Sequence, residues 1–348
     1  MGLDFLRNYG GRRVRNYEAQ PVLLDDTLMR GEVPEETAVN LSREYPHDEW
    51  HSIDVNNVNV PLDWPFRPMR FVDGKDVGRT VAWLQTREGY PVPVRLSEIG
   101  SVVMHNQDGQ LRREFEWVER VVSLMVDPFP WDEIESFAIA LQKARFRLLP
   151  CREPLHGMSY NFEEMRATTQ YRTNDEMSRL ERLALAHVRD IPTLVDGRLE
   201  PHVRAFDEER TPVVGLIKRH KQNYLHAQGW HVFYELQPGQ RTPAFLLIEK
   251  NIRVISWYLR LTGSNGELPN WGIVRLEIPE AFFVKTLAED SEYLNCLSHL
   301  ICEYRCHDRE YSRAPVSIHP IQRAEESLGS LFSQSETLIQ RFYHLTHL

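Results

Sequence analysis

The sequence predicts a mixed α/β fold, and three observations indicate it. Val-rich runs separated by turn residues predict a block of strands over residues 69–104. Amphipathic stretches after residue 127 predict helices that alternate with further strands. With 348 residues, the chain is long enough for one large domain or two ordinary ones. This order of strands and helices is typical of a mixed sheet flanked by helices.

The N-terminal part of the chain differs from the rest. Residues 1–66 are polar, rich in Pro, Asn and Asp, and show little periodicity. We expect them to form an extended arm that carries at most one short helix. The remainder, residues 67–348, is expected to form one domain, in which residues 105–170 are an insertion after the third strand.

The elements of this domain follow from local patterns. The first strands are expected at 69–74, 79–86 and 91–104, and residues 117–126 either continue the sheet or begin the insertion. Prolines at the start of residues 127–147 and basic residues near their end predict a helix. The later expected elements are a helix at 174–190, a strand at 191–197, a strand that runs into a helix at 211–225, strands at 245–261 and 271–280 joined by a turn, a helix at 289–307, a helix that starts at Pro320, and a closing segment at 334–345.

Composition excludes several classes of protein. The formal net charge of −9 argues against a protein that coats nucleic acid by bulk charge, but it is compatible with a nuclease, because metal-binding acids add to the count. No apolar run approaches the length of a membrane span, so no membrane association is expected. The N-terminus lacks the apolar core of a signal peptide, and four cysteines do not form a disulfide framework in so long a chain. We therefore expect a cytoplasmic protein.

Two aspartates occupy equivalent positions in the sequence. Asp73 and Asp196 each follow an apolar run and precede a glycine, so each is expected to end a strand. A single aspartate of this kind is most often a turn former, because its side chain bonds the backbone and the glycine supplies positive φ. Two of them, together with a nearby buried glutamate, indicate an oxygen-rich site that suits Mg²⁺ or Mn²⁺.

That glutamate is Glu181. It lies within the apolar stripe of the helix expected at 174–190, and no cation four residues away neutralises it. A carboxylate that faces a core needs a partner, which is either a distant arginine or a metal ion. Glu176 is the alternative carboxylate on the same helix.

A histidine offers a fourth group. His319 precedes Pro320 and so lies at the first turn of a helix, where the helix dipole favours the neutral imidazole that binds metals. A surface or capping histidine is the alternative interpretation. Two divalent ions in such a site would stabilise the attacking and leaving oxygens of a phosphodiester.

These pieces resemble the NurA family of DNA-end-processing nucleases. The matching motifs are FVDG at 71–74, RLE at 179–181, LVDGRL at 194–199 with VVGLIK at 213–218, RLEIP at 275–279, and a tyrosine followed eight residues later by a histidine, Tyr311 and His319. The resemblance implies a ribonuclease-H-like fold and a two-metal site, with Mn²⁺ or Mg²⁺ held by Asp73, Glu181, Asp196 and His319 and with Tyr311 in the active site. It also implies a homodimer through which DNA passes, and a hexameric HerA-type ATPase as partner.

Basic residues are expected to hold the DNA backbone. They are Lys75, Lys218 and the arm residues Arg12, Arg13 and Arg15. We expect a metal-dependent deoxyribonuclease that acts on linear ends and single-stranded tails as a 5′–3′ exonuclease in double-strand break repair. The alternatives are a degenerate nuclease fold that binds DNA ends or docks an ATPase, and an RNA-directed or structure-specific nuclease on the same fold.

Overall fold

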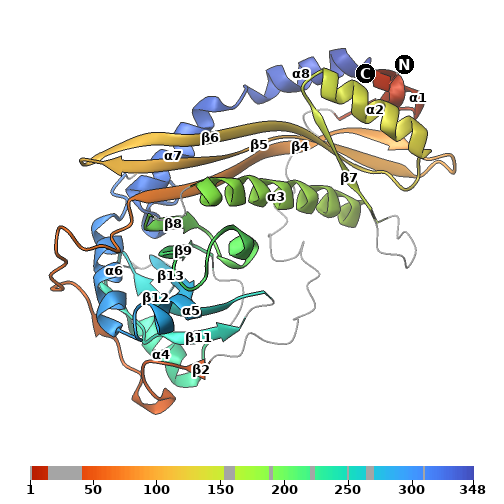
Figure 1. Ribbon diagram of the computed structural model, residues 1–348. Helices are drawn as coiled ribbons and strands as arrows, with labels where there is room; N and C mark the ends of the chain where they lie inside the picture. The colour runs from red at the N-terminus through yellow and green to blue at the C-terminus, as the bar shows by residue number, and fades with distance from the viewer. Residues whose placement is uncertain are drawn as a thin grey trace.

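The computed structural model describes residues 2–14, 41–152, 161–187, 191–219, 224–248, 251–263, 270–308 and 310–348. Within them, one mixed sheet runs through the molecule, with helices on both faces (Figure 1). This confirms the predicted mixed α/β class. None of the helices in these ranges combines the length and the apolar character that a membrane crossing requires.

Three long antiparallel strands, β4, β5 and β6, form one half of the sheet and extend beyond its other strands (Figure 1). The main path of the sheet has the order β2-β11-β12-β13-β9-β8-β4-β5-β6-β7, and β8 pairs in parallel with β4 and β9. The strands are β1 Arg12–Arg13, β2 Leu41–Ser42, β3 Ile53–Asp54, β4 Arg70–Gln85, β5 Pro91–Gln107, β6 Gln110–Met125, β7 Arg147–Cys151, β8 Thr193–Asp196, β9 Val213–Ile217, β10 Gln240–Arg241, β11 Phe245–Ile248, β12 Arg253–Arg260 and β13 Ile273–Pro279.

Two helices that cover opposite faces of β4 are important for the site. Helix α3 packs on β4 and β5 from one side, and α7 packs on the same strands from the other. The α-helices are α1 Phe5–Asn8, α2 Trp131–Lys143, α3 Phe162–His187, α4 Ala227–Glu235, α5 Glu280–Lys285, α6 Ser291–Glu303, α7 His319–Leu331 and α8 Ser335–Thr346. The 3₁₀ helices are η1 Gly2–Asp4, η2 His47–Glu49, η3 Glu200–Ala205 and η4 Ala314–Val316.

The apolar core forms separate clusters on the two faces of the sheet and at its far end. One cluster joins β12 and β13 to α6 and α7, and a second joins β8, β9 and β12 to α4 and the end of α3. A third lies where α1, α2 and α8 cover the distal ends of β4 and β5. Helix α8 and the N-terminus therefore lie at one end of the molecule, and β8 with the carboxylates described below lies towards its middle (Figure 1).

One strand prediction was wrong. Residues 69–74 and 79–86 are not two strands separated by a turn, because Arg70–Gln85 is a single strand that pairs with β5 along its length. Asp73 therefore does not end a strand, and its neighbour Gly74 is not a turn residue. Asp196 does end β8, as predicted, and Gly197 follows it at a φ of 136°.

Other boundaries differ from the sequence patterns. All but the last of residues 117–126 belong to β6, so they continue the sheet. Strand β7 then pairs with β6 in parallel inside the segment predicted as an insertion. Helix α3 begins at Phe162, twelve residues earlier than expected, and α4 was not predicted. In the N-terminal arm, α1 and β1 form regular structure, and β1 pairs with β4.

Candidate metal centre

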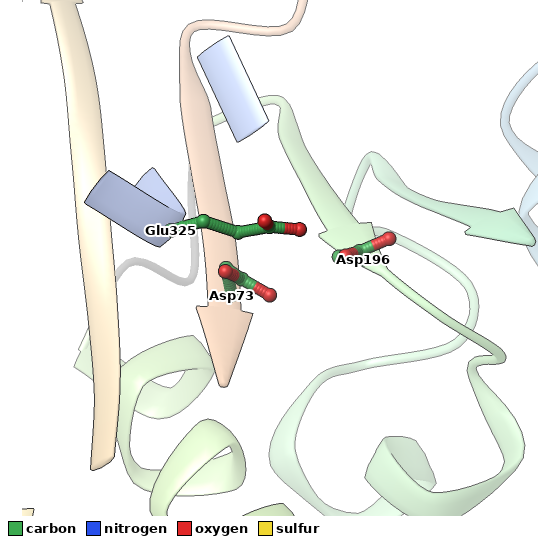
Figure 2. Close-up of side chains that lie close together, drawn as sticks. All are labelled: Asp73, Asp196 and Glu325. Atoms are coloured by element: carbon green, nitrogen blue, oxygen red, sulfur yellow. The ribbon is translucent and has the colours of Figure 1, made fainter. Parts of the chain in front are cut away.

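Three carboxylates from distant parts of the chain point into one space. Asp73 lies on β4, Asp196 ends β8 and Glu325 comes from α7 (Figure 2). The parallel register pairs Val72 with Val195, so the two aspartates occupy the next position on adjacent strands. One oxygen of each of the three carboxylates lies within 4.8 Å of the others. The sheet and α7 therefore fix the separation of these groups.

Burial makes the Asp73 carboxylate costly to ionise. Its side chain is only 4% exposed, and Oδ2 has no hydrogen-bond partner among the described residues. Burial first, and then the neighbouring Asp196 charge, raise the pKa of Asp73 well above its ordinary value. A buried carboxylate oxygen without a donor is expected at a place where a cation binds.

Glu181 reaches this region from the opposite face of β4. Side chains alternate along a strand, so Asp73 and Lys75 face α7 while Gly74 faces α3. A Cβ atom on Gly74 would overlap the Glu181 carboxylate, so the glycine leaves the space that this carboxylate occupies. Gly74 therefore makes room for the Glu181 carboxylate, and it does not form a turn.

The environment of Glu181 resembles that of Asp73. It is 5% exposed, and burial followed by the Asp196 charge raises its pKa to about 8. His202 lies beside this carboxylate, and its Nε2 is 3.5 Å from Glu181 Oε2. The predicted helix glutamate is thus buried on the α3 side of Gly74, near enough to Asp196 to feel its charge, but it is not part of the group of three carboxylates.

Two cations lie against the carboxylates. Lys218 Nζ, just beyond β9, donates to Asp196 Oδ2 at 2.8 Å and lies 3.6 Å from Glu325 Oε1. Arg313 donates to Glu325 Oε1 at 2.9 Å. Both cations contact Asp196 or Glu325, whereas among the described residues Asp73 and Glu181 form no ion pair with a lysine or arginine, and Arg182 influences Glu181 only as a nearby charge.

Glu176 has a different environment. It accepts hydrogen bonds from Arg147, at 2.5 Å, and from Arg179. Burial alone would raise its pKa, but these arginines lower the pKa of Glu176 below its ordinary value. The alternative carboxylate of α3 is therefore an ion-paired residue.

The late tyrosine and histidine are placed differently. Burial and then the nearby Glu325 carboxylate raise the pKa of Tyr311 above its ordinary value, and its buried hydroxyl has no hydrogen-bond partner among the described residues. His319 begins α7, as predicted within one residue, and its side chain is exposed. It is not part of the group of three carboxylates, to which the same helix contributes Glu325, six residues later.

The predicted nucleic-acid contacts fall into two places. Lys75 lies near the carboxylates, two residues after Asp73, and its Nζ would be 3.3 Å from a Cβ on Gly329 of α7. Arg12 and Arg13 pair with Trp83 and Ala82 at the other end of β4, roughly 30 Å from Asp73 at about 3.3 Å per residue. Arg13 also donates to Leu348 O and stacks on Tyr343. Arg15 lies outside the described residues.

The donor set fits a hard divalent cation. Carboxylate oxygens are the ligands that Mg²⁺ and Mn²⁺ prefer, and the unpartnered oxygen of Asp73 provides one without breaking a bond. The buried acidic cluster is therefore suited to metal binding. Among the described residues no cysteine belongs to this group, and Cys306 Sγ contacts Gln322 Oε1.

The sequence pattern did not identify Glu325, Arg313 or His202. Glu325 stands beside Glu326 on α7, and only its position next to the buried residues Ile321, Ala324 and Leu328 distinguishes the two glutamates. A helical-wheel count would have placed Glu325 at the edge of that apolar stripe.

Comparison with known proteins identifies the family. A model of the NurA domain matches residues 108–327, which is more than half of the chain. The chain belongs to the NurA family. The resemblance seen in the sequence motifs is thereby confirmed, and membership supports a nuclease.

The matched range includes most of the candidate site. Glu181, Asp196, Tyr311, His319 and Glu325 lie inside it, and Asp73 precedes it. Among solved structures, the chain is similar to the NurA nuclease from Sulfolobus solfataricus, with 9% identity, a TM-score of 0.39, and coverage of 88% of this chain and 89% of that one. No curated protein sequence matches the chain.

Proposed function

We propose that this NurA-family protein is a divalent-metal-dependent deoxyribonuclease that processes DNA ends. The observation that carries the proposal is the convergence of Asp73, Asp196 and Glu325 within 4.8 Å. In a chain of this family, such a cluster indicates phosphodiester hydrolysis. Its rigid elements fix the acids at a separation that loops would hold less well.

Asp73, Asp196 and Glu325 would hold the ion, and Glu181 would complete the site from the α3 face. Bound Mn²⁺ or Mg²⁺, as one ion or two, supplies activation of water and stabilisation of the leaving oxygen at the phosphate. His319 remains a proposed ligand by family resemblance, and it would need to approach from the exposed start of α7. Each of these assignments can be tested by substitution.

The basic residues of the site have a second role in this proposal. Lys218 and Arg313 neutralise Asp196 and Glu325 at 2.8 Å and 2.9 Å. If Asp196 and Glu325 instead bind a divalent ion, Lys218 and Arg313 would be free to bind a phosphate of the substrate. Lys75, on the same face of β4 as Asp73, would hold a neighbouring phosphate.

Tyr311, Arg12 and Arg13 would help to position the DNA. Tyr311 lies beside Glu325, where its hydroxyl would orient a phosphate oxygen by donating a hydrogen bond. Arg12 and Arg13 are too distant to touch the same phosphate, so any contact that they make is with DNA roughly 30 Å away. Those contacts would position the duplex and leave the chemistry unchanged.

The biological setting of the proposal comes from the family. It comprises 5′–3′ digestion of linear ends in double-strand break repair, a homodimer that encloses the DNA, and a HerA-type hexameric ATPase as partner. An enclosed site would admit a strand end or a single-stranded tail and exclude a closed duplex. An acidic exterior, with a net charge of −9, would add to this preference by hindering lateral binding.

The test is digestion of end-labelled linear DNA in Mn²⁺, Mg²⁺ or EDTA, beside a relaxed closed plasmid of the same sequence. We expect loss of the linear form with either metal, none in EDTA, and little nicking of the circle. Equal attack on linear and closed DNA would contradict end processing and indicate a structure-specific endonuclease. Binding of DNA ends without cleavage in any ion would indicate an adaptor.

A further inference from the structure

A buried histidine contacts Glu181, one of the acids assigned to the metal centre. His202 lies in η3, the 3₁₀ helix that follows β8, and is 3% exposed. Its Nε2 lies 3.5 Å from Glu181 Oε2, and its Nδ1 has no hydrogen-bond partner among the described residues. A buried polar ring that directs one nitrogen at a carboxylate is costly unless that contact is used.

The start of the segment that carries His202 is tied to α3 and to β13. Arg182, the neighbour of Glu181, donates to Pro201 O at 2.9 Å, so α3 and η3 are joined next to the histidine contact. The His202 backbone N–H donates to Leu199 O at 2.8 Å. The Leu199 N–H in turn donates to the buried Glu277 of β13 at 2.5 Å. The imidazole is therefore held in a framework tied to both α3 and the sheet.

Glu181 needs such support because of how it reaches the site. Its flexible side chain ends on the α3 face of β4, in the space that Gly74 leaves open. That glycine contributes no side chain to hold the carboxylate, and Arg182 uses its Nη1 on Pro201. His202 thus supplies a polar contact that restricts the Glu181 carboxylate from the side of η3.

We propose that His202 is a positioning residue that orients the Glu181 carboxylate towards the metal centre by donating a hydrogen bond from Nε2. The proposal rests on the proposed function, since it assigns Glu181 to that centre. Partners of this kind, which orient a metal ligand from behind, typically change metal affinity or activity 10- to 100-fold when removed.

The test compares two substitutions by Mn²⁺ affinity, measured calorimetrically without DNA. His202→Leu keeps most of the volume and removes the donor, whereas His202→Gln places an amide N–H near the Nε2 position. We expect roughly 10- to 100-fold weaker Mn²⁺ binding for the leucine variant and recovery to within about threefold of wild type for the glutamine variant. The unfolding free energy of each variant in EDTA separates a loss of affinity from a loss of fold.

Two controls make the result specific. His299→Leu removes a histidine of α6 that contacts Val55 O at 2.8 Å, and it should leave Mn²⁺ affinity unchanged. In a Glu181→Gln background, His202→Leu should weaken Mn²⁺ binding no further, because the contact it removes acts through Glu181. If His202→Leu does not fold, His202→Asn replaces it, since its shorter amide does not reach Glu181.

The outcomes distinguish this inference from the proposed function. Wild-type Mn²⁺ affinity of His202→Leu, glutamine as poor as leucine, or an undiminished effect in the Glu181→Gln background would each overturn the positioning role. Asp73→Asn is measured alongside. Unchanged Mn²⁺ binding in Asp73→Asn would instead refute the metal centre itself.

Discussion

Two buried glutamates of α3, five residues apart, have opposite electrostatic environments. Glu176 accepts hydrogen bonds from Arg147 and Arg179, and its pKa is lowered. Glu181 has no arginine hydrogen bond among the described residues, and its pKa is raised to about 8. Both are almost fully buried, at 3% and 5% exposed.

The difference shows how to separate a structural acid from a candidate ligand. Burial costs a carboxylate free energy in both places, and the arginines beside Glu176 offset that cost inside the fold. At Glu181 and Asp73 burial and then the like charge of Asp196 raise the pKa, and the nearby cations, Arg182 and Lys218 respectively, offset this only in part. A fold that keeps several buried acids with raised pKa values is suited to bind a cation there.

The largest effect is expected for the strand carboxylates. Asp73→Asn and Asp196→Asn should each lower nuclease activity at least about 100-fold, because charge stabilisation by a bound ion is worth several kcal/mol. Asp73→Asn should also raise stability in EDTA, since it removes a buried acid that the other acids repel. Activity is measured on labelled linear DNA, and stability by urea unfolding.

Asp76→Asn is the matched control for Asp73. Asp76 lies three residues further along β4 and is paired with Arg95 at 2.8 Å, outside the carboxylate group. Its variant should keep activity within a few-fold and lose a little stability. Activity of Asp73→Asn near that of Asp76→Asn would refute the assignment of the site.

The two glutamates of α3 provide the next test. Glu181→Gln should lower activity about 10- to 100-fold with little loss of stability. Glu176→Gln should keep activity and lose about 1–2 kcal/mol of stability, a modest figure because the arginine partners are 37% and 42% exposed and therefore screened. Equal activities of the two variants at saturating Mn²⁺ would show that Glu181 is not the important carboxylate.

These residues also show what the sequence could establish. Asp73, Asp196 and Glu181 were identified from apolar patterns and family motifs, and the structure brings them to one region. The reason given for Asp73 was wrong, because a strand that continues past a glycine looks like a strand that ends there. The predicted role of Gly74 failed for the same reason, since its importance depends on α3, more than one hundred residues later.

Glu325 was missed because the relevant contact is tertiary. No local pattern distinguishes it from Glu326, and only the packing of α7 on β4 directs it at Asp73. His319 was predicted from its motif and helix position, which the structure reproduces, but its exposed side chain leaves its metal role to experiment.

A smaller effect should separate these two residues of α7. Glu325→Gln should weaken Mn²⁺ binding about tenfold at every pH, because it removes a carboxylate oxygen of the cluster. His319→Ala should weaken binding more at the higher pH, because metal binding to an imidazole competes with its protonation. Calorimetric Mn²⁺ titrations at pH 5.5 and pH 7.5 check both. If His319→Ala keeps the pH dependence of wild type, His319 is not a ligand.

The last prediction concerns the pH dependence of stability in the absence of metal. The folded state raises the pKa of Glu181 to about 8, whereas the unfolded carboxyl titrates near 4.5. Between these values the folded state holds a proton that the unfolded state has lost, so the free energy of unfolding falls as pH rises through this window. One such group contributes a slope of at most about 1.4 kcal/mol per pH unit. Urea unfolding in EDTA from pH 5 to pH 8 measures it.

Glu176 supplies the contrast of opposite sign. Its lowered pKa gives stability that is present above the unfolded value and is lost as pH falls through the folded value, so Glu176→Gln should change the acid limb below about pH 4.5 and leave the slope between pH 5 and pH 8 intact. Glu181→Gln should reduce that slope, and Asp73, whose pKa is also raised, should account for part of the remainder. Saturating Mn²⁺ should raise stability most at pH 8, because binding requires the ionised acids that the metal-free fold disfavours. An identical slope in wild type and Glu181→Gln would mean that this carboxyl is already ionised at pH 5 by a partner that offsets its burial.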